Sequence, residues 1–291
     1  MTSDPAIGAK LSKGGRIIHL PFWKNTNASS EVLNESTGLT INKITAGADV
    51  ACIHARGIMY GVTDLAELIA GDDPMGAIAQ MYVRDWNRDM QNILVATLEG
   101  AFSATSMASS VKDISAVKGD GGVINKDAIV DALYAIGDSV DELQGIMMHS
   151  AVMAKLVKDN AIQYLPDSDG KPILPTYLNK TVIVDDALKP VDVTVDSDTK
   201  KAYPIYFFGA GAIAFNENKI LAETETDRDI RTGEDYLASR RVFTMHPRGI
   251  KWVGNAAGVT PSIAELKTGT NWELVEDTKN VHITKLMARV D

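Results

Sequence analysis

The longest regular pattern of apolar and polar positions lies between residues 74 and 102. Asp73 suits the N-cap of a helix, and Pro74 suits its first position. No further proline interrupts the stretch, and its glycines are Gly76 and Gly100. The pattern therefore predicts one helix from residue 74 to about residue 102, roughly 40 Å long at 1.5 Å per residue.

The large apolar residues of this predicted helix recur at every fourth position. We call them the winding stripe: Ile78, Tyr82, Trp86, Met90, Leu94, Leu98 and Phe102. Each step of four overshoots a full turn by about 40°, so the stripe turns around the helix instead of staying on one face. This spacing favours a helix that contacts different elements along its length, and we expect an isolated subunit to leave the stripe partly uncovered. A long core helix with loosely placed apolar residues is the alternative.

The segment before this helix is extended and largely polar. Residues 16–20 form a short apolar stretch that Pro21 should end, and residues 24–37 are typical of a long exposed loop. Residues 39–44 alternate between apolar and polar, as do residues 50–54, which is typical of half-buried strands, and Ala46-Gly47 between them offers a turn. Together they predict a long hairpin-like excursion with too few large apolar residues to be stable without a partner surface.

Short helices and strands alternate through the rest of the chain. The patterns predict helices at 64–70 (N-cap Thr63), 127–136 and 151–159 (N-cap Ser150), and strands at 145–149, 181–184, 203–208, 210–215, 236–245, 249–253 and within 272–290, with a hairpin at 192–201. Residues 223–235 are strongly charged and should be solvated. The fold class is therefore predicted to be α+β.

Composition limits the function classes. The 291 residues are 45% apolar and 23% charged, which is ordinary for a folded protein. The formal net charge of -9 makes the chain a poor general binder of nucleic acid, because phosphate contacts need clustered Lys and Arg. Cys52 is the single cysteine, so neither a disulfide nor a cysteine-based zinc site within one chain is expected. No apolar run approaches the roughly 20 residues of a membrane span.

Several residue patterns could carry chemistry. Residues 209–214, Gly-Ala-Gly-Ala-Ile-Ala, match the dinucleotide-binding pattern, but a turn-like sequence follows where a helix is needed. His149 and Ser150 suggest a hydrolase pair, although a helix cap explains Ser150 better. Residues 167–170 resemble the start of a calcium loop that lacks its later ligands. Asp185 and Asp186 are interpreted as turn or surface residues. We therefore expect a structural protein and not an enzyme, with no catalytic, metal-binding or cofactor-binding residues.

The order of these elements resembles the major capsid proteins of tailed bacteriophages, which share the Hong Kong ninety-seven type fold. Three regions carry the resemblance. They are residues 43–50 (KITAGADV) through Arg56-Gly57, then 64–68 (DLAEL) and 71–75 (GDDPM); Gly137-Asp138, 146–150 (IMMHS), Leu156 and 160–162 (NAI); and 241–252 (RVFTMHPRGIKW). Family members carry a longer segment before the position of Gly15 than this chain does.

The resemblance implies a domain organisation. It consists of a short N-terminal arm (1–14), an extended β-hairpin loop with its leading strand (15–62), a peripheral domain with the long spine helix and a β-sheet (63–118), an α/β axial domain (119–235), and returning peripheral strands with the C-terminus (236–291). The extended loop would lie over a neighbouring subunit, and the axial domain would pack around the centre of a capsomer.

The implied function is that of a coat protein that assembles into an icosahedral shell around phage DNA. The expected partners are copies of the chain in hexamers and pentamers, with portal, scaffolding or decoration proteins as further candidates. The inner face would meet packaged double-stranded DNA without sequence specificity, and no membrane is involved. The location would be the virion, after assembly in the host bacterial cytoplasm. An encapsulin-like nanocompartment shell protein is the alternative, and a nucleotide-binding enzyme using residues 209–214 is a third hypothesis.

We predict contacts between subunits at eight residues. They come from the loop, the strand after it and the winding stripe: Lys24, Glu31, Lys43, Ile44, Arg56, Tyr82, Trp86 and Met90. Lys24 and Lys43 lie in the loop that some relatives crosslink to a neighbour, but no motif assigns that chemistry to them.

Overall fold

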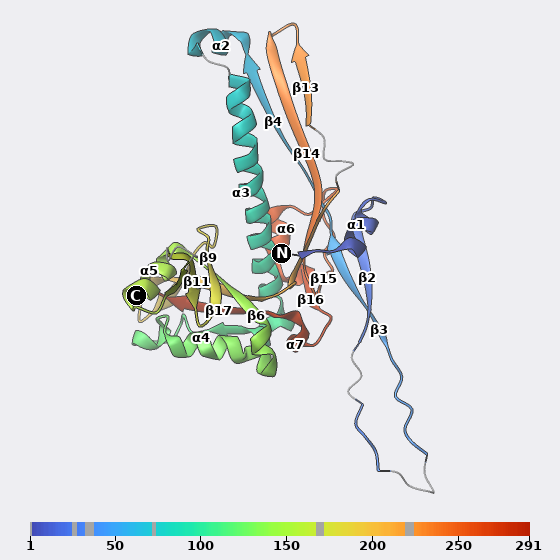
Figure 1. Ribbon diagram of the computed structural model, residues 1–291, viewed down its shortest axis with the longest axis vertical. Coiled ribbons are helices and arrows are strands. Elements are labelled where there is room, and N and C mark those ends of the chain that lie inside the picture. Colours follow the sequence, from blue (N-terminus) through green and yellow to red (C-terminus); the bar gives the residue numbers. More distant parts are fainter. Residues whose placement is uncertain (1, 25–27, 33–37, 72–73, 167–171, 219–223) are drawn as a thin grey trace.

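The computed structural model describes residues 2–24, 28–32, 38–71, 74–166, 172–218 and 224–291. The predicted long helix is confirmed as α3, Pro74–Ser103. It stands beside a long narrow sheet, and its C-terminal end reaches a second, broader sheet (Figure 1). The expected N-cap, Asp73, lies outside the described residues. The short helix predicted before it is also confirmed, as α2, Asp64–Ala70.

The first sheet is built around the 14-residue strand β14, Glu234–Pro247. Along one side β14 pairs with β4, His54–Thr63, and along the other with β13, Thr224–Asp229, and β12, Ile213–Glu217. A two-residue strand β1, Thr2–Ser3, adds to β12 in parallel. Most of this sheet extends beside the N-terminal half of α3 (Figure 1).

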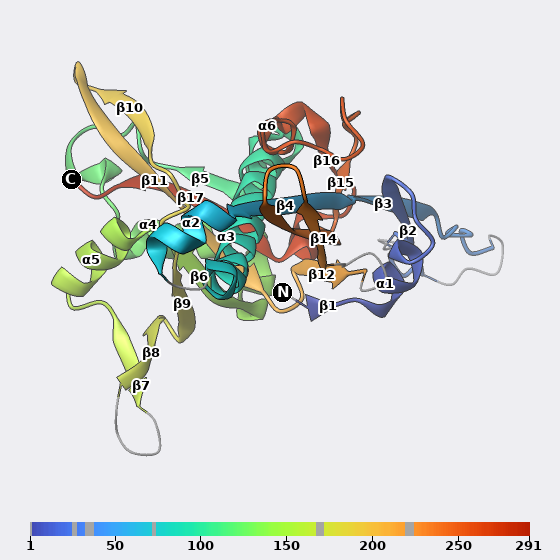
Figure 2. The same ribbon diagram turned by 90° about the horizontal axis from the view of Figure 1, so that it is seen from above.

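The second sheet contains eight described strands in the order β5-β17-β11-β6-β9-β8-β7, with β10 paired to β11. Their bounds are β5 Val111–Asp113, β6 Leu143–Met148, β7 Gln163–Pro166, β8 Pro172–Tyr177, β9 Lys180–Val184, β10 Val191–Val195, β11 Asp198–Gly209 and β17 Ile283–Arg289. Helices α4, Lys126–Leu133, and α5, Ser150–Lys158, pack with it around a separate apolar cluster that includes Ile129, Leu133, Val152 and Leu156. The β7–β8 and β10–β11 hairpins project from this sheet (Figure 2).

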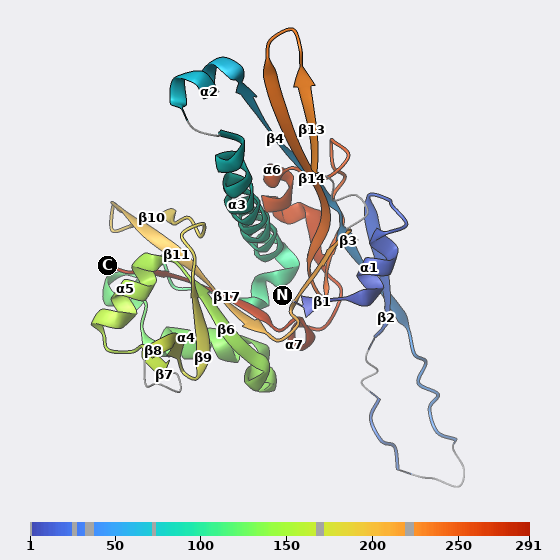
Figure 3. The same cartoon turned by 45° about the horizontal axis from the view of Figure 1, so that its top comes forward.

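A long arm leaves the body on the side opposite the second sheet (Figures 1 and 3). Its root is the antiparallel pair of β2, Ile17–Trp23, and β3, Ala46–Cys52. The described residues 28–32 and 38–45 continue outward without helix or strand. We define the arm as β2, β3 and these connecting residues. Helix α1, Pro5–Leu11, packs against β2 and β12 at the root.

Three local predictions for the arm are wrong. Pro21 does not end a strand, because β2 has no second neighbour among the described strands and tolerates a residue without an N–H. Gly47 is not in a turn but in β3. Residues 39–44 form no strand, because no described segment lies beside them to complete a ladder.

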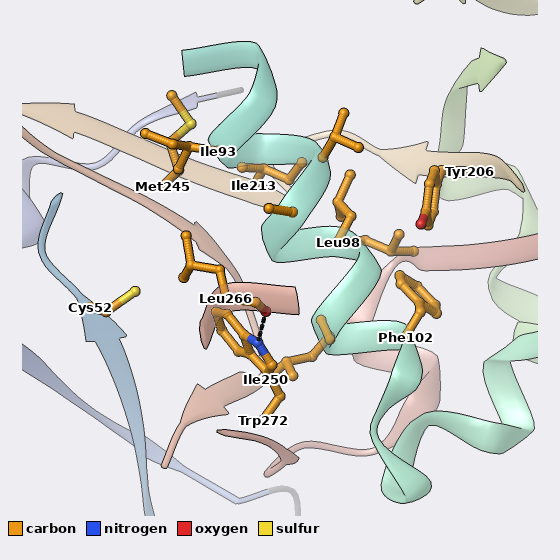
Figure 4. Packing of buried hydrophobic residues seen from close by; sticks show 14 of the residues in the cluster. Cys52, Ile93, Leu98, Phe102, Tyr206, Ile213, Met245, Ile250, Leu266 and Trp272 are labelled. Carbon is orange, nitrogen blue, oxygen red and sulfur yellow. Dashed lines mark hydrogen bonds between the residues drawn. The ribbon is translucent and has the colours of Figure 1, made fainter. Parts of the chain in front are cut away.

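Shorter elements connect the two sheets. They are β15 Ile250–Trp252, β16 Trp272–Leu274, α6 Ile263–Lys267, α7 Thr278–Val281 and the 3-10 helices η1 Thr105–Ser110, η2 Gly119–Gly122, η3 Tyr134–Glu142 and η4 Gly269–Asn271. Helix α6 lies directly against α3 at Gly100, where an added Cβ would be 1.8 Å from the Leu266 carbonyl oxygen. The indole N–H of Trp272 donates to that same oxygen at 2.8 Å (Figure 4).

The sheets do not follow the expected domain boundaries. β12 and β13, expected in the axial segment 119–235, belong to the first sheet with β14. β17, expected among the peripheral strands of 236–291, lies in the second sheet between β5 and β11. The chain crosses between the sheets at residues 209–212, where β11 ends and β12 begins, and returns through α7.

The predicted cap of α5 is also displaced by one residue. His149 has the extended backbone of an N-cap, and its Nδ1 accepts a hydrogen bond from the Ala151 N–H at 3.0 Å. Ser150 is the first residue of the helix instead. Across the helices that the structure describes, none has the length and apolar character needed to span a membrane.

Candidate assembly surfaces

The winding stripe is covered by the subunit itself. The single O–H of Tyr82 lies within hydrogen-bond distance of two carbonyl oxygens, those of Leu237 and of Ile58, the latter at 3.2 Å. The indole N–H of Trp86 donates to Ser239 Oγ at 3.1 Å. Farther along, the ring of Phe102 packs against that of Tyr206, in the second sheet. The stripe therefore does contact different elements along its length, as its spacing predicted.

The expectation that an isolated subunit would leave the stripe partly uncovered is wrong. Tyr82 and Trp86 are 7% and 2% exposed, and Met90 is partly buried against the same core. Strands β4 and β14 of the first sheet contact α3, α6 lies against it, and second-sheet residues such as Tyr206 pack into the same core at Phe102. A contact between subunits through Tyr82, Trp86 or Met90 stays a prediction, and these side chains have little free surface to support it.

The arm, in contrast, exposes apolar side chains to solvent. Leu39 is 61% exposed, Ile41 85% and Ile44 65%. Lys43, between them in sequence, is exposed as well. Large aliphatic side chains that protrude together from a narrow extension have no core of their own to join, which is typical of a contact surface.

The two legs of the arm are tied at two described points. The Lys24 N–H donates to the Thr45 carbonyl oxygen at 2.9 Å, where the strand pairing ends. Farther out, the Thr40 N–H donates to the Glu31 carboxylate at 3.0 Å. The pKa of Glu31 is lowered by the Thr40 side chain first and then by this backbone hydrogen bond. Lys24 and Glu31 thus lie exposed on the arm, as predicted contact residues should, while also fixing its shape.

A shallow groove of about 430 Å³ runs between β4 and α3 on the body. It is lined by residues of both charges: Arg56, Gly57, Ile58, Tyr60, Asp85, Arg88, Asp89 and Asn92. Tyr60 donates to the Asp85 carboxylate, and that bond raises the pKa of its hydroxyl. Among the described strands, β4 pairs with β14 alone, so the edge of β4 facing away from β14 has no strand beside it.

Arg56 lies at one end of this groove. Its Nη2 donates to the Pro261 carbonyl oxygen at 2.6 Å, which ties β4 to the loop before α6. Its Nε is buried and has no hydrogen-bond partner among the residues that the structure describes. A buried guanidinium N–H without an acceptor is costly, so this predicted contact residue retains unused bonding capacity.

A further exposed apolar surface lies at the far end of the first sheet. Leu65, Leu68 and Ile69 of α2 are 64%, 79% and 77% exposed, and Ile230 in the nearby β13–β14 turn is 90% exposed. Arg228 holds this end together by contacting the carboxylates of Asp64, at 2.7 Å, and Asp235, at 2.9 Å. We did not predict this surface, although the spacing of residues 65, 68 and 69 on one face of a short helix was visible in the sequence.

The candidate chemical sites do not assemble. After Gly209 the chain enters strand β12, and not the helix N-terminus that a dinucleotide site requires. Gly209 is needed for packing instead, since an added Cβ would lie 2.7 Å from the Cβ of His282. His149 Nδ1 is engaged in capping α5, and the buried Asp185 accepts from the Ala187 N–H in a turn. Residues 167–170 lie outside the described residues. In the described part of the chain, no three His, Cys, Asp or Glu side chains gather as a metal site would require.

The chain is similar to known proteins both in sequence and in structure. Residues 71–282 match the family model described as "Major capsid protein 13-like". The chain is 40% identical over 283 residues to the major capsid protein of Bacillus phage SPP1, which covers 97% of this chain and 86% of that protein. Among solved structures, the capsid of Ralstonia phage GP4 is similar with a TM-score of 0.65 at 8% identity, covering 96% of this chain and 84% of that one.

The same fold occurs in a nanocompartment. The SrpI encapsulin of Synechococcus elongatus aligns with a TM-score of 0.55 at 9% identity, over 85% of this chain and 79% of that one. At such low identity the likeness shows a shared fold alone.

Proposed function

Since the chain belongs to the Gp13-like family of major capsid proteins, we propose that it builds its shell by laying the arm of each subunit on the β4–α3 groove of a neighbouring copy. As a phage major capsid protein, it self-assembles into the virion shell. The observation that carries the proposal is the contrast between the two surfaces. The subunit covers its winding stripe but leaves the apolar residues of the arm and the edge of β4 open.

The chemistry of the two surfaces is complementary. Residues 38–45 pair with no described strand, although the Thr40 N–H and the Thr45 carbonyl oxygen are hydrogen-bonded, and the outer edge of β4 likewise has no described strand beside it. Adding a strand to an open sheet edge satisfies the backbone groups of both segments. Arg56, at one end of the groove, carries a positive charge, and Glu31 on the arm is an exposed carboxylate of the opposite charge.

The contact energy per subunit would be modest. An aliphatic side chain that goes from exposed to fully buried contributes about 1.5–3 kcal/mol, before the entropic cost of association. Leu39, Ile41 and Ile44 start 61%, 85% and 65% exposed, so each has much of that gain available. Many weak contacts of this kind, closed by symmetry, produce a stable shell from subunits that remain separate when dilute.

The finer partners follow as proposals from the family. Hexamers and pentamers would form the shell in the host cytoplasm, with portal, scaffolding or decoration proteins joining it. The net charge of -9 is consistent with an inner face that meets packaged double-stranded DNA without sequence-specific binding. We further propose that the role of the chain is structural and not catalytic.

A nanocompartment shell is the weaker alternative, because its support is the fold alone, whereas the similarity to the SPP1 protein extends along the sequence. Nucleotide-dependent catalysis at residues 209–214 has no support, since a strand and not a helix follows them. Particles that enclose DNA would favour the phage shell, and particles that enclose a protein cargo would favour the nanocompartment.

The test of the arm contact is Ile41→Asp, with Ile41→Val as the matched control. Ile41 is 85% exposed, so neither change should alter the free energy of unfolding of the subunit. We expect Ile41→Val to form shells and Ile41→Asp to remain as small oligomers, as judged by sedimentation velocity and electron microscopy. Shells of Ile41→Asp at the parental yield would refute the proposed contact.

A further inference from the structure

The root of the arm is fastened to the body by a buried polar contact. Asp49, in β3, is 6% exposed, and His246, near the end of β14, is fully buried. Nε2 of His246 and Oδ2 of Asp49 lie 2.8 Å apart. The Gly249 N–H donates to the same oxygen at 3.1 Å, and the Val50 N–H donates to Oδ1 at 2.8 Å.

The surroundings keep Asp49 ionised. Burial alone would raise the pKa of its carboxyl, but the hydrogen bond and charge of His246 and the two backbone donors lower it below its ordinary value. On β4, His54 is held neutral by burial, which lowers its pKa to about 3. Glu276, after β16, has its pKa raised by burial first and then by the Asp49 charge. Arg248, in the turn after β14, is paired with Asp4 at 2.8 Å.

Such a contact is demanding in geometry. A buried carboxylate costs several kcal/mol unless donors surround it, and here two of the donors, His246 at the end of β14 and Gly249 in the turn after it, are about 200 residues away in sequence. A change in the angle between β3 and β14 would break those bonds and leave the charge buried without compensation. An apolar contact in the same place would tolerate sliding.

The N-terminal segment also holds the root of the arm against the body. Ile7 and Leu11 of α1 are buried against Ile18 of β2 and Ala214 of β12. The Asn216 side-chain amide donates to the Asp4 carbonyl oxygen at 2.7 Å, next to the ion pair with Arg248. The strap from Thr2 to Leu11 thus joins the arm to the turn that directly follows His246.

We propose that Asp49 and His246 are positioning residues that fix the direction of the β2–β3 part of the arm within a single subunit, before a neighbour is contacted. A preset arm loses less conformational entropy when it docks. The positioning itself is a property of one chain; only its consequence for assembly rests on the function proposed above.

The experiment measures the arm's direction by electron paramagnetic resonance distances. Spin labels are placed at Thr45→Cys, at the outer end of the root, and Gln91→Cys, on an exposed position of α3, in a Cys52→Ala background, diluted with unlabelled protein. We expect a narrow distance distribution in this parent. It should broaden by roughly twofold or more in His246→Leu and Asp49→Ala, and stay close to parental in His246→Gln, which keeps a donor for the carboxylate.

Two outcomes would overturn the proposal: a broad distribution in the parent, or an unchanged one in a folded His246→Leu or Asp49→Ala protein. If circular dichroism shows that both variants fail to fold, the double change Ile7→Ala and Leu11→Ala in the strap provides the test. It should broaden the distance distribution, and an unchanged width would refute the proposed positioning of the arm. A broadened distance distribution in a variant that still assembles shells at the parental yield would count against the proposed arm contact, while leaving the positioning role of Asp49 and His246 intact.

Discussion

The buried, neutral His54 at the start of β4 predicts how the stability of the folded subunit depends on pH. His54 is fully buried, with its Nε2 3.8 Å from the sulfur of Cys52 and its ring 5.4 Å from that of Phe243. Its Nδ1 is buried without a partner. Burial, with smaller contributions from the Arg56 and His246 charges, lowers the pKa of His54 from 6.5 to about 3.

His54 should lower the free energy of unfolding of the subunit as the pH falls. Below pH 6.5 the unfolded chain binds a proton at His54, whereas the folded chain does not until about pH 3. The free energy of unfolding should therefore fall by about 1.4 kcal/mol per pH unit within that window from this residue alone. Between about pH 7.5 and about pH 4.5 the expected loss is about 2.7 kcal/mol.

The assay is urea unfolding of dilute subunits, followed by tryptophan fluorescence, across this pH range. His54→Phe keeps the ring contact with Phe243 and cannot titrate, so the difference between parent and variant isolates His54 from the carboxylates. His19→Gln, at an exposed position, is the matched control and should decline like the parent. Parallel curves for the parent and His54→Phe would refute the reasoning.

Three further changes test the packing, each by the free energy of unfolding from urea titration. Trp86→Ala should cost about 3–5 kcal/mol, because it empties a fully covered site; a loss near zero would contradict the burial described above. Gly100→Ala should destabilise strongly because its Cβ would meet the Leu266 carbonyl oxygen at 1.8 Å, whereas Gly38→Ala, with nothing within 4 Å, should be neutral. The buried Arg289 donates to the Val117 and Gly119 carbonyl oxygens at 2.7 Å, so Arg289→Met should cost about 1–3 kcal/mol, and an unchanged stability would show that water replaces the guanidinium as donor.

Local patterns predicted the helices better than the strand pairing. The helix at 74–103 follows from a favourable first position, a run of good helix formers and the absence of proline, all of which are visible within thirty residues. The pairing of β4 with β14 joins residue 54 to residue 243, and no local pattern specifies it. The second sheet likewise recruits β17 from the C-terminal end, which is why the expected boundaries at 119, 235 and 236 do not match the sheets.

The predicted contact residues also divide into those that local sequence predicts correctly as exposed and those that it does not. Lys24, Glu31, Lys43 and Ile44 are exposed because the arm contains too few large apolar residues to fold back, which composition alone indicates. Tyr82 and Trp86 were predicted as contacts from the winding stripe, but a turning stripe fits a helix wrapped by its own sheet equally well. Periodicity shows that a side chain will be buried, and it does not show whether its own chain or another buries it.

The failed strand prediction at residues 39–44 carries a consequence of its own. Alternation between apolar and polar residues is costly in a solvated loop, because Leu39 and Ile41 gain nothing from exposure. The pattern is nevertheless present, and within the described subunit no segment pairs with it. We interpret the alternation as a strand pattern that another copy completes, with β4 as the edge that receives it. The body of the subunit satisfies its own pattern at Tyr82 and Trp86, and the arm does not, so the difference between the two locates the part of the sequence that assembly must bury.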